Sequence, residues 1–398
     1  MDSREGKVKR KERFGNIADY VSWRGDLSFS ADHWHEADAL AVAVIAYANF
    51  GENALTFGNG QPLPFSELAA SDLLERLPQQ GLPGSVPIRN QLITDMAGSI
   101  RYRDIRILDQ VSDTDRSRSI QFSAITLDIP GIGTAIGFRG TDPTLVGWKE
   151  DFMMSYMSPV PAQSAAVDYL RKTAAETEGP LILAGHSKGG NLAMYAGAHT
   201  SEEIQDRIAG IYAFDSPGLD DATIASGQYE RIRPLIRSVI PSDSIVGLLM
   251  NYNPNYRVVS STARSIAQHD PFTWKLMGHR FLEAGDLSTD ARIMDQTVHE
   301  WLKSCTPEQR EVFVSAVFSL FDRDQEAGGT ESAPSIMDEN TRKMVLSLLH
   351  NFITIQAENS WIAKVRKPFL QAAEDLRAKL REELGITKPD TNQMEVTS

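Results

Sequence analysis

The pattern of hydrophobic and polar positions divides the chain into parts with different predicted structure. Residues 1–15 are polar and basic and indicate a solvated tail. The segment 38–50 reads DALAVAVIAYANF, an alanine-rich apolar run of helix length, and residues 66–77 carry leucines at helical spacing. Between these two segments, the glycines and prolines of residues 51–64 indicate a loop. The first part of the chain is therefore predicted to be mainly helical.

The middle of the chain has the pattern of a sheet with helices between its strands. Short apolar or alternating runs predict strands at residues 121–129, 134–138, 180–184, 208–214 and 238–240. Helical patterns occupy residues 163–178 and 191–199. The first two strands, separated by a Pro-Gly turn, are typical of a hairpin, and the later alternation predicts a mainly parallel sheet covered on both faces.

Strand signals stop after about residue 290. Residues 306–309 read TPEQ, the order of a capping box with proline at the first helical position, and predict a helix. Two further helices are predicted at about 340–356 and 360–384. The predicted organisation is a disordered tail (1–15), a main domain (16–285) with an N-terminal helical part (16–110) and a core (111–285), a C-terminal helical region (286–385) and a disordered tail (386–398).

Composition narrows the class of partner and compartment. The chain has 398 residues, of which 41% are hydrophobic and 23% charged, which is typical of a globular protein with a sizeable core. Its formal net charge is −13, so we expect no nucleic acid as a partner. The single cysteine, Cys305, allows no internal disulfide and no cysteine metal site, and we expect neither metal nor cofactor. With no signal peptide pattern and no apolar run of membrane-spanning length, a cytoplasmic location is predicted.

The segment Gly185-His186-Ser187-Lys188-Gly189 fits G-x-S-x-G and follows a strand pattern and precedes a helical one. A sharp strand-to-helix turn of this kind exposes a serine hydroxyl above the sheet, and the helix N-terminus favours a developing negative charge nearby. The sequence therefore predicts an α/β-hydrolase fold with Ser187 as a catalytic nucleophile, although an ordinary serine in a tight turn would give the same letters.

A serine nucleophile needs a histidine base that is oriented by a carboxylate, and in this fold the chain order is serine, acid, histidine. Of the five histidines that follow Ser187, His269 lies in a loop-type segment before a proline, and we favour it over His279. For the acid, Asp243 follows a predicted strand and lies close to His269 in the chain, and we favour it over Asp215, which also follows a strand.

Two further groups of residues complete the predicted site. The backbone N–H of Lys188 and a donor from Thr141, in the segment 137–142, are predicted to form the oxyanion hole. Methionine-rich segments on either side of the motif in sequence suit either an acyl-chain pocket or the core, because thioether side chains adapt to irregular apolar surfaces. The candidate substrate-binding residues in these segments are Met153, Met154, Met157 and Leu249.

The motifs Phe138-Arg-Gly-Thr141 with Trp148 and Asp151, and Gly185-His-Ser-x-Gly-Gly190, resemble the class 3 lipases. The N-terminal NIADYVSWRGD at residues 16–26 and Lys188-Gly-Gly-Asn191 are closer still to an uncharacterised bacterial branch of that group. The resemblance covers about residues 16–285 and implies a triad of Ser187, Asp243 and His269 with Thr141 and Lys188 as oxyanion donors. Class 3 lipases usually carry leucine at the position of Lys188, so this cation either favours an anionic substrate or points away from the site.

These residues predict a serine esterase or lipase-like enzyme that acts on acyl esters through an acyl-enzyme. An acyltransferase or thioesterase would use the same nucleophile, and a non-catalytic binding module could keep the same fold. The expected partner is a small acyl ester or lipid-like molecule, and the C-terminal helices are candidates for a contact between identical chains. The complete set of nucleophile, base, acid and oxyanion donors argues against the binding module.

Overall fold

The structure of the protein is a computed structural model. It describes residues 14–50, 62–70, 85–115, 120–141, 153–244, 246–251 and 255–292, together with 295–296, 299, 306–308 and 310–311. The chain divides into two compact units, Met1–Arg310 and Glu311–Ser398, and the features below belong to the first. Most of the two predicted tails, most of the predicted loop at 51–64 and nearly all of the three predicted C-terminal helices lie outside the described residues. Gly15, at the end of the predicted N-terminal tail, forms a β-bridge with Leu276, so the tail is predicted one or two residues too long.

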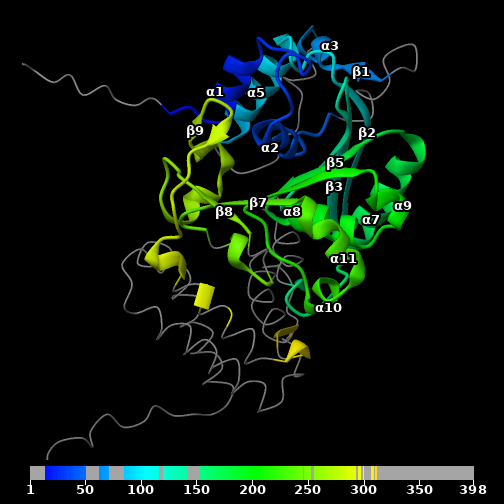
Figure 1. Ribbon diagram of the computed structural model, residues 1–398, viewed down its shortest axis with the longest axis vertical. Coiled ribbons are helices and arrows are strands. Elements are labelled where there is room, and N and C mark those ends of the chain that lie inside the picture. Colours follow the sequence, from blue (N-terminus) through cyan, green and yellow to red (C-terminus); the bar gives the residue numbers. More distant parts are fainter. Residues whose placement is uncertain are drawn as a thin grey trace, which may run out of the picture. The chain divides into compact units, whose positions relative to one another are not determined.

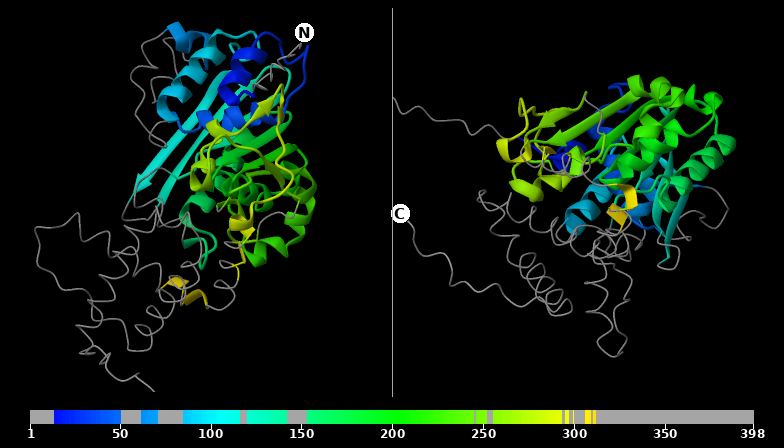
Figure 2. Two further views of the ribbon diagram at one scale, coloured as in Figure 1. Left: turned by 90° about the vertical axis from the view of Figure 1, so that its left-hand side faces the viewer. Right: turned by 90° about the horizontal axis from the view of Figure 1, so that it is seen from below.

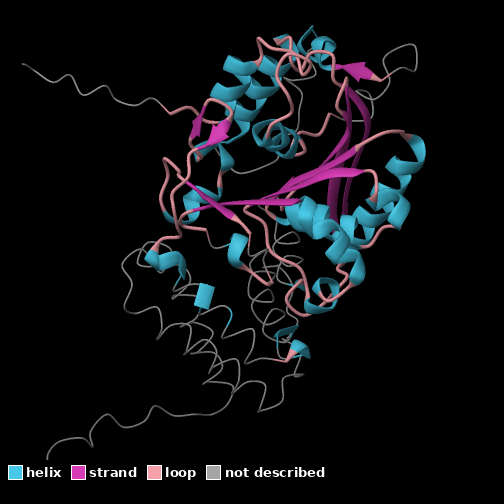
Figure 3. Ribbon diagram, viewed as in Figure 1, coloured by secondary structure: helices cyan, strands magenta, loops and turns pink. Residues whose placement is uncertain are grey.

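The centre of the first unit is an eight-stranded sheet whose strands follow one another in chain order (Figures 1 and 3). The pairings from β1 to β4 are antiparallel and those from β4 to β8 are parallel. The strands are β1 (Leu63–Pro64), β2 (Arg106–Asp115), β3 (Ile120–Ile129), β4 (Gly133–Phe138), β5 (Leu181–His186), β6 (Ile208–Phe214), β7 (Ile236–Pro241) and β8 (Arg257–Val259). A separate hairpin joins β9 (Leu276–Met277) to β10 (Arg280–Phe281). The predicted hairpin and the parallel order after it are confirmed.

Helices cover both faces of the sheet (Figure 2). On one face lie the N-terminal helices α1 (Ile17–Arg24), α2 (Glu36–Ile45) and α5 (Ser85–Gly98), and on the other lie α7 (Pro161–Glu176), α8 (Lys188–Ala198) and α11 (Gly227–Ile232). Successive side chains of a strand point to opposite faces, so on β5 Ile182 and Ala184 join the first core while Leu181 and Leu183 join the second. Three shorter helices are α3 (Phe65–Ala70), α9 (Glu202–Gln205) and α10 (Asp221–Ile224).

Two strands and two helices have weak sequence signals. β2 is mostly half-exposed, with the sequence RILDQVSDTD, so it lacks the apolar run that marks a buried strand. β8 has only three residues. The helices α1 and α5 are amphipathic only weakly, and α5 carries Pro87 in its first turn, where proline is tolerated. No helix within the described ranges combines the length and the apolar character needed to cross a membrane.

Candidate active site

Ser187 occupies a strained turn between β5 and α8. Its φ of 58° and ψ of −135° lie in a region that side-chain-bearing residues rarely adopt, and its side chain is 7% exposed. Two neighbouring glycines make the turn possible, because a Cβ at Gly185 would lie 2.1 Å from the backbone of Gly189, and one at Gly189 would lie 2.1 Å from the carbonyl oxygen of Phe138. The structure thus has a tight strand-to-helix turn at Ser187, as the motif predicts, and α8 begins directly after the serine.

A histidine and an aspartate pair at the same end of the sheet. The Nδ1 atom of His269 lies 2.7 Å from Oδ2 of Asp215. Asp215 directly follows β6, the neighbour of β5, and Ser187 N–H donates to the carbonyl of Phe214, one residue before it. The rings of His269 and His186 are 4.5 Å apart, so the imidazole of His269 lies beside the residue that precedes the serine. The chain order Ser187, Asp215, His269 matches the order of this fold.

The Asp215 carboxylate is buried at 1% exposure and held from two sides. Its Oδ1 accepts hydrogen bonds from the Ser244 hydroxyl and from the backbone N–H of Gly247, which lies 3.1 Å away. Its Oδ2 is the atom that faces His269. Asp215 itself has a positive φ of 42°, a conformation uncommon for aspartate. The carboxylate is therefore fixed in place, with one oxygen left to orient the imidazole.

The structure pairs His269 with Asp215 and not with Asp243, so the expected contact between Asp243 and His269 is wrong. The carboxylate of Asp243 accepts a hydrogen bond from Nε2 of Gln268, and its backbone N–H donates to Oε1 of the same side chain. The physical reason is that Asp243 follows β7, which is one strand further from β5 than β6 is. At that position its neighbour is Gln268, the residue before His269. Asp243 thus anchors the 3-10 turn Ser265–His269 through Gln268.

The other histidines considered for the base lie elsewhere. The ring of His279 stacks on that of His35, with centroids 4.1 Å apart. His199 stacks on Tyr195 at the end of α8, the last turn away from the serine. His299 forms its contacts with Asp295. Among the described histidines, His269 is the one that the structure brings to the Asp215 carboxylate.

The predicted oxyanion segment lies against Ser187. A Cβ at Gly140 would lie 3.0 Å from the Cβ of Ser187 and 2.5 Å from the carbonyl oxygen of His186. Thr141 follows it and is half-buried. Lys188 is the first residue of α8, and its ammonium group is turned inward, donating to the carbonyl of Gln121 at 3.0 Å. Lys188 is 1% exposed, so its charge is directed into the protein and away from the surface.

The candidate substrate-binding residues separate into two environments. Met153 and Met154 are buried and form a small apolar cluster with Val160, against which Tyr156 and Met250 pack. Met157 is 39% exposed, and Leu249 is half-buried, with its carbonyl accepting from Gly218 N–H. The cluster therefore brings together residues from both methionine-rich segments. Residues 142–152, which connect it in the chain to the oxyanion segment, lie outside the described ranges.

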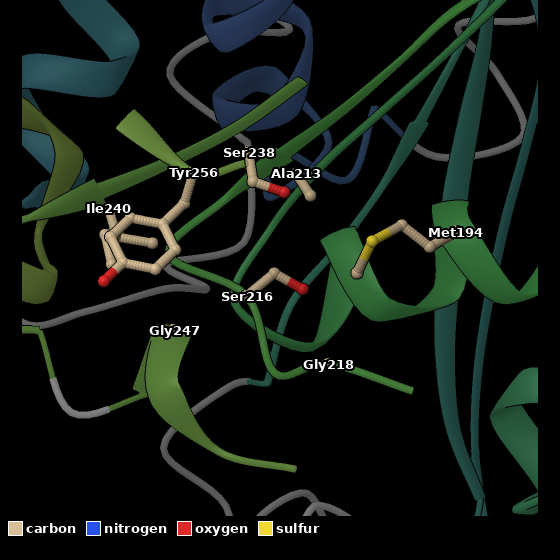
Figure 4. A pocket seen from close by; sticks show the side chains of 8 residues that line it. All are labelled: Met194, Ala213, Ser216, Gly218, Ser238, Ile240, Gly247 and Tyr256. Atoms are coloured by element: carbon tan, nitrogen blue, oxygen red, sulfur yellow. The ribbon is translucent and has the colours of Figure 1, made fainter. Parts of the chain in front are cut away.

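A small cavity lies between α8 and the ends of two parallel strands (Figure 4). Its lining residues come from α8 and from the ends of β6 and β7 with the loops that follow them: Met194, Ala213, Ser216, Gly218, Ser238, Ile240, Gly247 and Tyr256. Its cavity volume is about 10 Å³, close to the space that a single water molecule needs. It is therefore too small for a substrate. Nowhere in the described ranges do three histidine, cysteine or acidic side chains gather in a way that could hold a metal ion.

Two residues of the site lack a distinctive sequence signal. The Nε2 atom of His186 lies 2.7 Å from the carbonyl oxygen of His269, and its Nδ1 lies 3.1 Å from the hydroxyl of Tyr47. His186 stands inside the G-x-S-x-G motif at a position where any residue is allowed. Tyr47 belongs to an apolar segment after α2, where periodicity predicts only a core residue.

A serine on a strand-to-helix elbow above parallel strands, with an imidazole–carboxylate pair at the same edge, defines a lipase-like α/β-hydrolase. The chain belongs to the Mbeg1-like family, whose model matches residues 96–319, more than half of the protein. Among solved structures it is similar to a chain described as the crystal structure of M37 lipase, at 18% identity and a TM-score of 0.36, covering 54% of this chain and 70% of that one. A search of curated proteins finds no match.

Proposed function

We propose that this protein is a serine hydrolase that cleaves acyl esters, with Ser187 as nucleophile, His269 as base and Asp215 as the acid that orients it. The observation that carries the proposal is the 2.7 Å contact between His269 Nδ1 and Asp215 Oδ2 at the edge of the sheet where Ser187 stands on its elbow. A carboxylate at Nδ1 holds the proton there and leaves Nε2 with the lone pair that a base needs.

The reaction follows from these positions. The Ser187 hydroxyl oxygen forms a bond to the ester carbonyl carbon while His269 Nε2 takes the hydroxyl proton. The Lys188 N–H and a donor from Thr141 stabilise the negative charge on the carbonyl oxygen, aided by the N-terminus of α8. The bond to the alcohol breaks and the alcohol takes the proton from His269, which leaves the acyl-enzyme. Water then repeats the sequence, releasing the carboxylic acid and restoring Ser187.

The apolar cluster of Met153, Met154, Val160, Tyr156 and Met250 supports an acyl chain as the part of the substrate that is bound. Thioether side chains pack against flexible hydrocarbon without a fixed geometry, which suits a range of chain lengths. We propose that Met157 and Leu249 border this cluster on its more exposed side. Because the Lys188 ammonium group points inward, we expect no preference for substrates that carry an anionic group.

A fluorophosphonate probe tests the nucleophile directly, because it bonds covalently to a serine activated by a histidine. The intact protein should be labelled at Ser187, and Ser187→Ala should lose the label while keeping its unfolding midpoint. The matched control is Ser216→Ala, which removes a nearby buried hydroxyl that bonds only to its own chain neighbour among the contacts resolved. Labelling that persists in Ser187→Ala, or no labelling of the folded wild type, contradicts the proposal.

A panel of p-nitrophenyl esters of increasing acyl length then separates hydrolysis from acyl transfer. Turnover with water as the acceptor supports the hydrolase. A labelled serine with a stable acyl-enzyme that discharges only to an added alcohol, amine or thiol acceptor would instead identify an acyltransferase. Hydrolysis of acyl thioesters in preference to the oxygen esters would identify a thioesterase.

A further inference from the structure

His186 is a buried histidine beside the proposed base, and its hydrogen-bond partners fix its tautomer. Nε2 lies 2.7 Å from the carbonyl oxygen of His269, which can only accept, so Nε2 must carry the proton. Nδ1 then has the lone pair and accepts from the Tyr47 hydroxyl 3.1 Å away. His269 has the opposite arrangement, because the Asp215 carboxylate at its Nδ1 also only accepts. Two neighbouring imidazoles are therefore held in opposite tautomers.

The environment of His186 keeps it uncharged. The residue is 2% exposed, and burial lowers the pKa of its imidazole well below the ordinary value, with the charge of nearby His269 lowering it further. A second cation 4.5 Å from the ring of His269 would oppose the positive charge that His269 acquires during the reaction. A neutral His186 can hold the backbone of His269 without that cost.

Tyr47 connects this contact to the oxyanion segment. Its hydroxyl oxygen lies where a Cβ at Gly140 would come within 2.2 Å, so the hydroxyl packs directly against the Gly140 backbone. Its carbonyl accepts from Arg89 in α5 at 3.1 Å, which fixes the tyrosine from the N-terminal helices. One side chain therefore touches both the segment that precedes Thr141 and, through His186, the loop that presents His269.

We infer that Tyr47 and His186 form a positioning pair that sets the distance between the His269 imidazole and Ser187 while bracing the oxyanion segment. His186 touches neither the substrate nor the transferred proton, and acts through the backbone carbonyl of His269. This inference rests on the proposed function for its kinetic consequences, whereas the tautomers and contacts that it requires can be measured without any substrate.

Variants of His186 and Tyr47 that remove the contacts of the positioning pair to different extents test the inference. Gln has the same number of bonds from Cβ to Nε2 as His, so His186→Gln keeps a donor for the His269 carbonyl, whereas His186→Leu removes it. We expect kcat on an ester to fall about 100-fold in His186→Leu, since misplacing a catalytic group by about 1 Å costs that much. Tyr47→Phe, which loses one hydrogen bond, should lower kcat about tenfold. His186→Gln should recover most of the loss, and KM should stay within about threefold in all of them.

Matched controls remove similar groups away from the site. Tyr20→Phe deletes a buried tyrosine hydroxyl that donates to Asp38, and His199→Gln replaces a histidine at the far end of α8. Both should keep the wild-type kcat whatever they do to the unfolding midpoint. Equal kcat losses in Tyr20→Phe and Tyr47→Phe would reduce the pair to general stability and overturn the inference.

The tautomers can be measured directly by nitrogen NMR of the histidine side chains in the full chain at neutral pH. We expect the Nε2-protonated tautomer for His186 and the Nδ1-protonated tautomer for His269, and an Nδ1-protonated His186 would overturn the inference. Fluorophosphonate labelling of the wild type distinguishes a failure of the proposed function from a failure of the positioning pair. An unlabelled wild type refutes the proposed function, whereas a labelled wild type with unchanged kcat in His186→Leu refutes only the positioning pair.

Discussion

Two carboxylates of this protein are each 1% exposed, yet their surroundings differ in kind. Asp38, in the N-terminal helical part, faces the guanidinium of Arg101 at 2.7 and 2.8 Å and accepts from the hydroxyls of Tyr20 and Tyr102. Asp215, at the edge of the sheet, faces an imidazole, a serine hydroxyl and a backbone N–H. The first cluster pairs a charge with a permanent cation, and the second pairs it with a group that can take up and release a proton.

The difference extends to solvent access. The side chains of Asp38 and Arg101 are both fully buried, whereas the side chain of His269 is 17% exposed next to a 1% exposed Asp215. Burial acts to lower the pKa of Arg101, but the hydrogen bonds and charge of Asp38 outweigh it and raise the pKa, so the guanidinium stays charged. A buried carboxylate alone therefore does not mark a catalytic site. The carboxylate that we propose as catalytic differs in its partner, an imidazole that is partly exposed to solvent.

The largest expected effect is on activity, in Asp215→Asn. An amide at this position can donate to Nδ1 and so favours the wrong tautomer of His269, which places the proton on the nitrogen that should accept it. We expect kcat to fall about 10⁴-fold with the fold retained. The measurement is ester hydrolysis at neutral pH alongside thermal unfolding. A loss of less than about tenfold would mean that another group orients the base.

Asp38→Asn should give the reverse outcome, with a large effect on stability and none on chemistry. It leaves the buried Arg101 charge without its carboxylate, which costs about 3–5 kcal/mol in the free energy of unfolding. Denaturant unfolding measures this cost, and kcat of the protein that remains folded should match the wild type. If kcat fell as far as in Asp215→Asn, the contrast between a structural and a catalytic carboxylate would be lost.

Ser244→Ala tests how strongly the Asp215 carboxylate is held. The variant removes one charged hydrogen bond, worth about 1.5–3 kcal/mol, from the oxygen that does not face His269. If the carboxylate orients the base only when fixed from both sides, kcat should fall roughly ten- to hundredfold with KM nearly unchanged. Full activity in Ser244→Ala would show that the Gly247 N–H is sufficient.

The pH dependence of stability sharpens the comparison from the side of His186. Its folded pKa lies below the ordinary value of 6.5, so below pH 6.5 the unfolded chain binds a proton that the folded chain does not. Stability should therefore rise with pH up to about 6.5 and then level off, with a contribution from this residue of at most about 1.4 kcal/mol per pH unit. His186→Gln should lose that part of the slope between pH 5 and 6.5, as measured by denaturant unfolding. An identical slope in both proteins would contradict a neutral, buried His186.

The sequence predicts the elements of the site better than its pairings. The elbow at Ser187, the strands before it and the loop character of His269 are local properties, and each leaves a motif or a period in the chain. The partner of His269 is a long-range property, because Asp215 and Asp243 both follow predicted strands of the same sheet. Chain distance favoured Asp243, but it says nothing about which strand end lies beside Ser187, and β6 is the strand that pairs directly with β5.

The residues that support the site could not be predicted from the sequence, for a different reason. The hydroxyl of Tyr47 lies in an apolar run that predicts only burial, and the weakly hydrophobic β2 lacks the pattern of a strand. The inward direction of Lys188 depends on the carbonyl of Gln121, a residue of β3 far away in the chain. A hydrogen bond between residues far apart in the chain leaves no periodic pattern of hydrophobic residues in either segment, so the sequence does not reveal it.

The smallest expected effect is in Asp243→Asn, which replaces the carboxylate that sequence order alone would choose as the acid. The asparagine keeps the backbone N–H that donates to Gln268 and retains an oxygen that can accept from Gln268 Nε2, so the turn that carries His269 should stay in place. We expect kcat to fall by no more than about threefold, because a neutral hydrogen bond replaces a charged one and the difference is near 1 kcal/mol or less at a half-buried position. The same ester assay applies, with Asp215→Asn measured in parallel. A 10³-fold loss in Asp243→Asn beside a mild loss in Asp215→Asn would return the acid to Asp243, and would require the loop of His269 to move from its position in this structure during the reaction.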